Sequence, residues 1–156
     1  MGTRVPTWVR VGVVATLAVP QLIIGLWAML APERWFDTFP GFAPHLVAAA
    51  PPYNAHLVSD VGAAFFATGV ALLVAAAWAT RPAIWTALVA YVAFTAPHAL
   101  YHATHPADAL SGVADVGNVL LLVSSVVLAF VYAWGAATPA TARIERRDDE
   151  VLVSAR

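Results

Sequence analysis

Three of the chain's five histidines lie within the stretch APHALYHATH, at the end of an apolar run. His98, His102 and His105 are spaced by four and three residues, so one face of a helix carries all three. An imidazole can bind a metal ion, exchange a proton near neutral pH or form a hydrogen bond. The stretch therefore indicates a metal site, a proton-handling site or polar side chains that have reached the aqueous boundary.

Carboxylates also occur inside apolar stretches. Asp60 follows His56 by four residues, and Asp115 comes three residues before Asn118. A charged group in the bilayer costs at least about 2.5–3.5 kcal/mol on insertion scales, so we expect Asp60 to point into the protein. His98 is its expected partner, because Asp60, His98 and Asn118 should each lie about one helical turn below the membrane boundary.

A metal site is the first hypothesis for these residues. Imidazoles on successive turns together with carboxylates suit zinc, iron or copper, and the chain has no cysteine to supply a thiolate. The predicted ligands are His98, His102, Asp60, Asp115 and His56. A metal-activated water there would make the protein a small membrane-embedded metal-dependent enzyme, and the residues leave open whether it is an enzyme.

A second hypothesis is a site for a small lipophilic molecule, such as a quinone-like ligand, with mostly apolar walls and a few convergent polar groups. The predicted binding residues are Asp60, His98, Asp115, Asn118, Gln21 and Tyr101. A third alternative is a non-catalytic accessory subunit of a membrane complex. The small residues of VGAAFFATGVALLVAAA would suit close helix packing in that role.

The composition fixes the class of protein that must position these groups. Of 156 residues, 61% are hydrophobic and 11% are charged, and the mean hydropathy is +0.76. These values are typical of a membrane protein. The net charge is −1 without a basic patch, which argues against nucleic-acid binding. No glycine-rich nucleotide-binding or nucleophile-elbow motif is present.

Four apolar segments are long enough to cross a bilayer, which takes about 20 helical residues. They cover residues 9–30, 57–78, 83–102 and 112–134. Lipid-exposed backbone must be helical, so the sequence predicts an all-α, four-helix transmembrane domain over residues 1–138. Residues 31–56 would form a proline-broken aromatic outer loop, either a membrane-hugging connector or a lid. Residues 139–156 would form a cytoplasmic tail.

The arginines predict the orientation. Arg4, Arg10 and Arg81 lie on the same side as the four arginines of the tail, and Arg34 alone lies opposite. By the positive-inside rule both termini are cytoplasmic. The five histidines then lie in or beyond the outer half of the bilayer.

Short matches between the chain's halves favour a 2+2 parallel repeat. Asp60-Val61-Gly62 recurs as Asp115-Val116-Gly117, and VATLAVPQL resembles VAFTAPHAL. The alternative is chance similarity among common membrane residues. A repeat would relate two helical hairpins by a pseudo-two-fold axis along the membrane normal, around which Gln21, Asp60, His98 and Asp115 would face one another.

The segments LAPERWFDTFPGF, PPYNAHLVSDVGA, APHALYHATH and DVGN resemble those of small bacterial four-helix membrane proteins, and the architecture is more distantly similar to DoxX-like membrane proteins. The resemblance covers about residues 25–120. It implies a bundle in the bacterial cytoplasmic membrane and a redox-linked accessory role, and it supplies no catalytic residues. The expected partners are the lipid bilayer and a second copy or a larger membrane complex.

Overall fold

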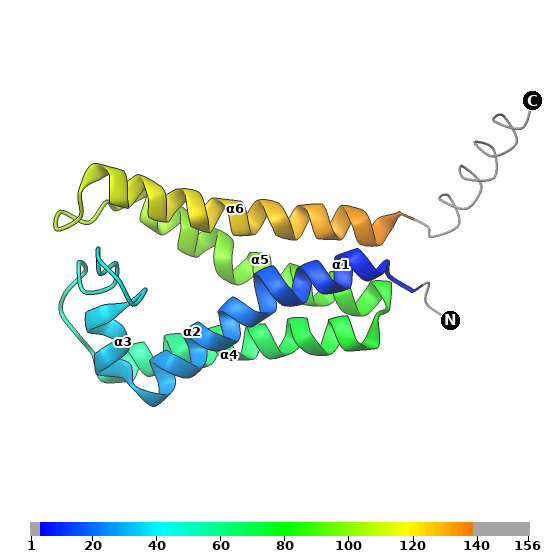
Figure 1. The fold of residues 1–156 in the computed structure, drawn as a ribbon, viewed down its shortest axis with the longest axis horizontal. Coiled ribbons are helices and arrows are strands. Elements are labelled where there is room, and N and C mark those ends of the chain that lie inside the picture. Colours follow the sequence, from blue (N-terminus) through cyan, green and yellow to red (C-terminus); the bar gives the residue numbers. More distant parts are fainter. Residues whose placement is uncertain (1–3, 139–156) are drawn as a thin grey trace, which may run out of the picture.

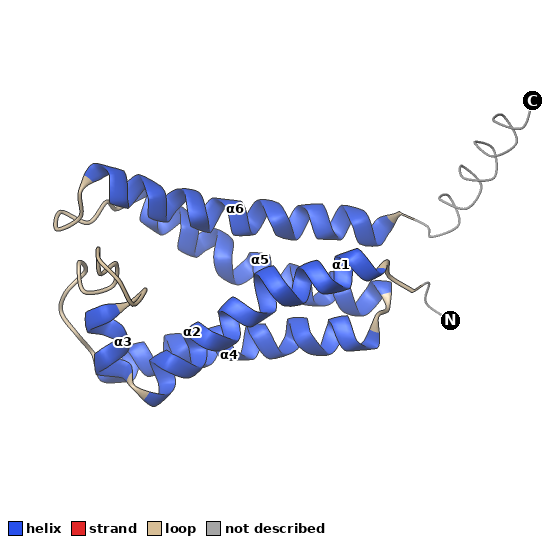
Figure 2. Cartoon of the chain, viewed as in Figure 1, coloured by secondary structure: helices blue, strands red, loops and turns tan. Residues whose placement is uncertain are grey.

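The fold was analysed in a computed structural model that describes residues 4–138. The described residues form helices joined by turns and loops, so the predicted all-α class is confirmed (Figures 1 and 2). The first long helix has three parts, α1 (Thr7–Gly12), the π-helical turn η1 (Val13–Ala18) and α2 (Val19–Leu30). The remaining helices are α3 (Pro32–Thr38), α4 (Ala55–Trp78), α5 (Arg81–Thr104) and α6 (Gly112–Ala137).

Four of these helices are long and apolar enough to cross a membrane, as a multi-pass membrane protein requires. They are Thr7–Leu30, Ala55–Trp78, Arg81–Thr104 and Gly112–Ala137. Each extends the predicted span by two or three residues at one end or both. The predicted tail, residues 139–156, lies outside the described residues.

The bundle has two ends, which are named here for what they carry. The terminal end holds the start of α1, the turn between α4 and α5, and the end of α6 (Figure 1). The loop end holds α3 and the connections 39–54 and 105–111. Local signals in the sequence set the helix boundaries. Asn54 caps α4 by accepting a hydrogen bond from the backbone of Leu57, and Ser111 caps α6 in the same way.

The π-helical turn η1 ends at Ala18, two residues before Pro20. Proline has no N–H to give to the carbonyl four residues back, and its ring crowds that carbonyl. The hydroxyl of Thr16, the residue at that position, donates to the carbonyl of Gly12 at 2.9 Å. Proline and π-helical turns are both known causes of kinks in helices, and the first helix bends here (Figure 1).

The helices associate as two pairs. Helix α2 packs along α4, and α5 packs along α6. The two pairs meet toward the terminal end, through η1 with α6 and α4 with α5, whereas within the described chain α2 makes no close backbone approach to α5 or α6. The pairs therefore diverge toward the loop end (Figure 1). A 2+2 repeat would need this pairing, and the repeat itself stays a prediction.

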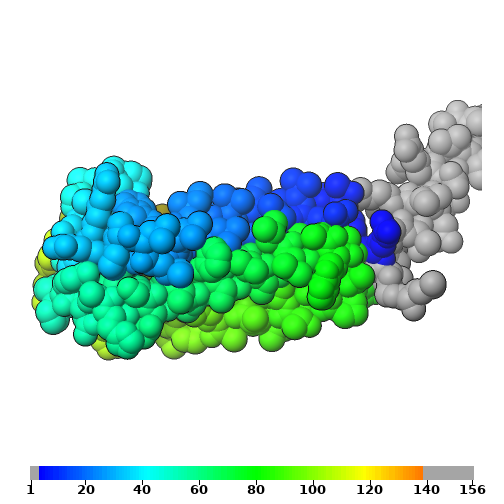
Figure 3. Space-filling view, turned by 90° about the horizontal axis from the view of Figure 1, so that it is seen from below, coloured from blue at the N-terminus to red at the C-terminus, as the bar shows by residue number. Residues whose placement is uncertain are grey.

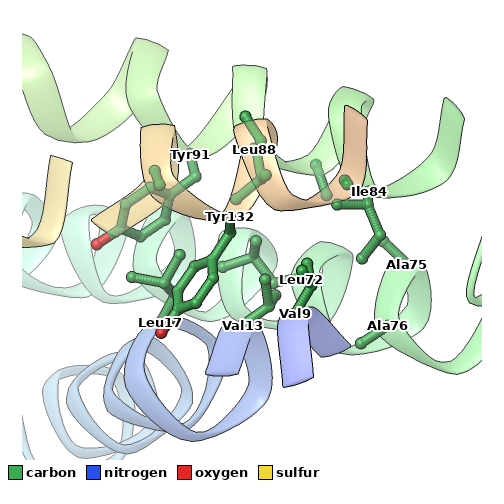
Figure 4. Packing of buried hydrophobic residues seen from close by; sticks show 14 of the residues in the cluster. Val9, Val13, Leu17, Leu72, Ala75, Ala76, Ile84, Leu88, Tyr91 and Tyr132 are labelled. Atoms are coloured by element: carbon green, nitrogen blue, oxygen red, sulfur yellow. The ribbon is translucent and has the colours of Figure 1, made fainter. Parts of the chain in front are cut away.

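The main core lies in the terminal half, where side chains of all four long helices interlock (Figure 4). Val9, Val13 and Leu17 of the first helix are fully buried, as are Leu72 of α4 and Ile84 of α5. The backbone of Val5 also donates to the carbonyl of Ala79 at 2.9 Å. In addition, Arg10 Nε donates to the Ala76 carbonyl at 2.9 Å and so satisfies the last turn of α4.

A smaller core closes the loop end of the α2–α4 pair. The loop predicted over residues 31–56 contains α3, whose Trp35 is buried against Ala28 and Val58. Trp35 also packs on Phe39, with ring centroids 5.3 Å apart. This part of the connector is thus a packed element of one helix pair.

Candidate functional site

One inward-facing stripe of α5 changes from apolar to polar along its length. The stripe is the set of residues that helical spacing places toward the bundle: Ile84, Leu88, Tyr91, Thr95, His98 and His102. The first four are buried, with at most 3% of each residue exposed. His98 and His102 continue the same face but are only half-buried, because the helix pairs have begun to diverge. The histidines therefore occupy positions where a closed bundle would place core side chains.

Aromatic rings surround His98. Its ring lies edge-on to Phe65 of α4 at 6.2 Å between centroids. It lies parallel to Phe94, one turn away on α5, at 6.4 Å. Phe65 and Phe94 themselves meet edge to face at 5.0 Å. His102 follows with its ring 4.8 Å from that of His98. The imidazole pair is thus flanked by hydrocarbon on the side of α4.

Helix α6 contributes the polar neighbour of these histidines. Asn118 Nδ2 lies 3.5 Å from His102 Nδ1, across the contact between α5 and α6. Asn118 is therefore level with His102. The sequence predicted it to be level with His98, which lies one helical turn farther from the loop end. Asp115 is half-buried, and its Oδ1 accepts a long hydrogen bond of 3.4 Å from the backbone of Ala107. That contact ties the 105–111 connection to the start of α6.

The expectation that Asp60 points into the bundle toward His98 is wrong. Its side chain is 64% exposed, and its partner is His56 of the same helix, at 3.3 Å between Oδ2 and Nε2. Helix α4 turns Gly62, Phe65 and Gly69 inward, and helical spacing places Asp60 on the opposite face. The face that α4 presents to α2 and α5 sets this orientation. His56, 88% exposed, shares the outer position, and α4 lies at the surface of the molecule (Figure 3).

Tyr101 and His105 also lie away from the inward stripe. Their rings stack on each other at 4.3 Å with an interplanar angle of 10°. Both are exposed, and His105 Nδ1 lies 3.1 Å from the carbonyl of Tyr101. These two residues cap the end of α5. They do not join His98, although the ring centroids of Tyr101 and His102 lie 6.0 Å apart.

Gln21 lies deeper, at the start of α2, and is 6% exposed. It extends toward Tyr91, whose hydroxyl lies close to the side chains of Gln21 and Ser125. Tyr91 is not among the predicted site residues, so sequence reasoning missed this polar cluster of three helices. The signal was present, because Tyr91, Thr95, His98 and His102 share one helical face.

The predicted metal ligands are not brought together as one set. His98 and His102 are adjacent, whereas Asp60 and His56 form their own pair on the outside of α4. Over residues 4–138 no group of three or more His, Asp or Glu side chains is close enough to hold a metal ion. What the inward groups can do is form hydrogen bonds, since neutral imidazole and carboxamide each offer a donor and an acceptor.

The chain was compared with known proteins in three ways. Neither the protein-family models, nor the curated proteins, nor the solved structures include a match to the chain. The resemblance to DoxX-like membrane proteins therefore stays a prediction. The chain itself is a helical, multi-pass membrane protein with a polar stripe between two helix pairs.

Proposed function

We propose that the protein binds a small lipophilic molecule between the α2–α4 and α5–α6 pairs, in the half of the bundle nearer the loop end. His98, His102 and Asn118 would contact the polar group of that molecule. One observation carries the proposal. The buried stripe of α5 continues into two half-buried histidines at the level where the helix pairs separate.

The surroundings of the histidines fit such a ligand better than they fit a metal ion. Ligand sites are mostly apolar with a few polar groups that fix orientation. Here Phe65 and Phe94 supply apolar surface, and the pair formed by His102 and Asn118 supplies hydrogen-bonding groups. A carbonyl or hydroxyl in the ligand could pair with either side chain. Asp60 is not part of this proposal, since it lies on the outer face of α4.

We further propose that the bundle lies in a bacterial cytoplasmic membrane with its loop end outside. Arg4, Arg10 and Arg81 gather at the terminal end, whereas Arg34 lies in α3 at the loop end. A bias of this kind favours the arginine-rich end as cytoplasmic. The chain has no cysteine, so single cysteines at Ala43 and Thr80 can be labelled with a membrane-impermeant thiol reagent. We expect labelling of intact cells at Ala43 only. Labelling at Thr80 alone would reverse the orientation.

Native mass spectrometry of the purified protein, together with elemental analysis, tests the ligand proposal. We expect an organic molecule to accompany the wild-type chain and to be reduced at least tenfold in His98→Leu and His102→Leu. The matched control is His45→Leu, an exposed histidine in the 39–54 connection, which should keep the ligand.

The other functions are distinct outcomes of the same experiment. A stoichiometric metal that disappears with His98 would replace the lipophilic ligand by a metal site. A protein that is empty in every variant and purifies with a second polypeptide would favour the accessory subunit. Each of these results would overturn the proposed ligand.

A further inference from the structure

One buried polar side chain on the inward faces has an atom without a partner. Gln21 is 6% exposed, and its Oε1 has no hydrogen-bond partner among the described residues. A buried amide oxygen without a donor is unfavourable, and more so inside a bundle surrounded by lipid. Trp35 Nε1 is the other atom in this state, but it lies within the aromatic cluster of α3. Gln21 instead faces the region between the helix pairs.

The neighbours of Gln21 determine which kind of partner is missing. The Ser125 hydroxyl donates to the Leu122 carbonyl at 2.8 Å, so toward Tyr91 it can act only as an acceptor. The Tyr91 hydroxyl lies close to both Ser125 and Gln21. It can donate to Ser125, and no donor in the described residues reaches Gln21 Oε1. An amide oxygen only accepts hydrogen bonds, so the missing partner is a donor.

The packing around Gln21 differs between the two ends of the bundle. Toward the terminal end the bundle is closed by the main core, in which Leu17 is fully buried and Leu88 is 2% exposed. In Figure 4 the Tyr91 hydroxyl points away from the other labelled core side chains. Toward the loop end the same face of α5 continues to Thr95, whose hydroxyl already donates to the Tyr91 carbonyl at 2.8 Å. Beyond it lie the half-buried histidines.

We infer that Gln21 Oε1 accepts a hydrogen bond from a hydroxyl group of the lipophilic ligand. The ligand class is then an apolar molecule that carries a phenol or alcohol at its deep end, with its body directed toward the loop end. His98 lies seven residues along α5 from Tyr91, or about 10 Å in a helix. A second polar group about that far from the hydroxyl would meet the histidines. This inference rests on the proposed function and adds the chemistry of the ligand's inner end.

Two matched probes test the inference. 4-Heptylphenol and 4-heptylanisole have similar size and hydrophobicity, but only the phenol has an O–H donor. Binding to the full chain in lipid nanodiscs can be measured by isothermal titration calorimetry. We expect the phenol to bind at least tenfold more tightly than the methyl ether. Gln21→Met keeps the length of the side chain and removes the acceptor, so it should abolish the difference between the probes.

Two further variants guard against a trivial result. Tyr91→Phe removes the hydroxyl that lies beside the amide, so the preference for the phenol should fall without disappearing. Ser124→Ala changes an exposed hydroxyl beside Ser125 and should leave both dissociation constants unchanged. Thermal unfolding of each variant shows whether it is folded. If Gln21→Met does not fold, the test rests on Tyr91→Phe.

The outcomes separate this inference from the proposed function. If both probes bind equally and both are weakened by His98→Leu, the deep acceptor is overturned and the lipophilic site stands. If the phenol preference survives in Gln21→Met, the acceptor is another group, which also overturns the inference. If neither probe binds and the purified protein carries no organic molecule, both the inference and the proposed function fail.

Discussion

The terminal half and the loop half of the bundle use the same helices in opposite ways. In the terminal half, apolar side chains of all four long helices interlock, and Leu17, Leu72 and Ile84 are fully buried. In the loop half, α6 has no buried residue between Gly112 and Leu128, and Phe65 of α4 still packs on Phe94 of α5 across the two pairs. The inward stripes of α5 and α6 become polar over this half. In this bundle, the helical face on which a polar residue lies is therefore a better guide to the site than the residue's depth in the membrane.

The difference in packing between the two halves can be tested first by truncating a buried side chain in the terminal half. Leu17→Ala should lower the free energy of unfolding by about 2–5 kcal/mol, because its side chain is fully buried among partners that cannot collapse onto the cavity. Unfolding in mixed detergent micelles, followed by the fluorescence of the six tryptophans, measures the loss. Leu120→Ala is the control in the loop half. Leu120 is 63% exposed, so its loss should be within about 0.5 kcal/mol.

Two glycines allow the tight contact between α2 and α4 to be compared with the open surface of α6. A Cβ on Gly25 would lie 2.5 Å from the Phe66 backbone nitrogen and 2.7 Å from the Gly62 carbonyl oxygen. Gly25→Ala must therefore push α2 from α4, and we expect a loss of about 1–3 kcal/mol. Gly117 of α6 has no atom within 4 Å of such a Cβ, so Gly117→Ala should stabilise its helix by about 0.5–1 kcal/mol. Equal effects at both sites would contradict the described packing.

A polar contact links the first helix to α6 near the closed half. Thr16 Oγ1 and the Tyr132 hydroxyl lie 3.0 Å apart. Tyr132→Phe should lower the free energy of unfolding by about 0.6 kcal/mol, and by no more than about 1.7 kcal/mol, as is typical of such bonds in membrane proteins. A double-mutant cycle with Thr16→Val measures the coupling. Strict additivity of the two substitutions would mean that the side chains do not interact.

The smallest expected effect concerns Asp60 on the outer face of α4. Its pair with His56 is exposed on both sides, so Asp60→Asn should change the free energy of unfolding by less than about 0.5 kcal/mol. The same detergent titration measures it, with Asn118→Leu on the inward face for comparison. A loss above about 2 kcal/mol for Asp60→Asn would restore the inward orientation that the sequence suggested.

Segment length and composition were enough to predict the four spans, because lipid leaves the backbone no alternative to a helix. The histidine stripe of α5 was also predictable, since its spacing places His98 and His102 on one face whatever the bundle looks like. Asp60 was misplaced because its depth was considered without its direction around α4. The inward face of that helix is set by Gly62, Phe65 and Gly69, and their helical spacing places Asp60 on the opposite face.

The divergence of the helix pairs could not be predicted in the same way. It depends on the bend in the first helix and on how closely side chains of different helices interlock, and neither follows from the pattern of one segment. Pro20 removes a helical hydrogen bond, but its presence does not specify the π-helical turn η1 or the approach of Gln21 to Tyr91.

The π-helical turn has a consequence for how the first helix tolerates changes in length. Each hydrogen bond in η1 spans five residues instead of four, so this turn holds about one residue more than an α-helical turn. An uninterrupted α-helix of the same sequence would rotate every later residue by about 100°, and Gln21 would leave Tyr91. Deleting one residue within Val13–Ala18 should instead convert η1 to α-helix and keep Val9 and Gln21 in phase. The same deletion between Leu88 and Thr95 would turn both histidines of the stripe away from α4, so the two helices differ in where a residue can be lost.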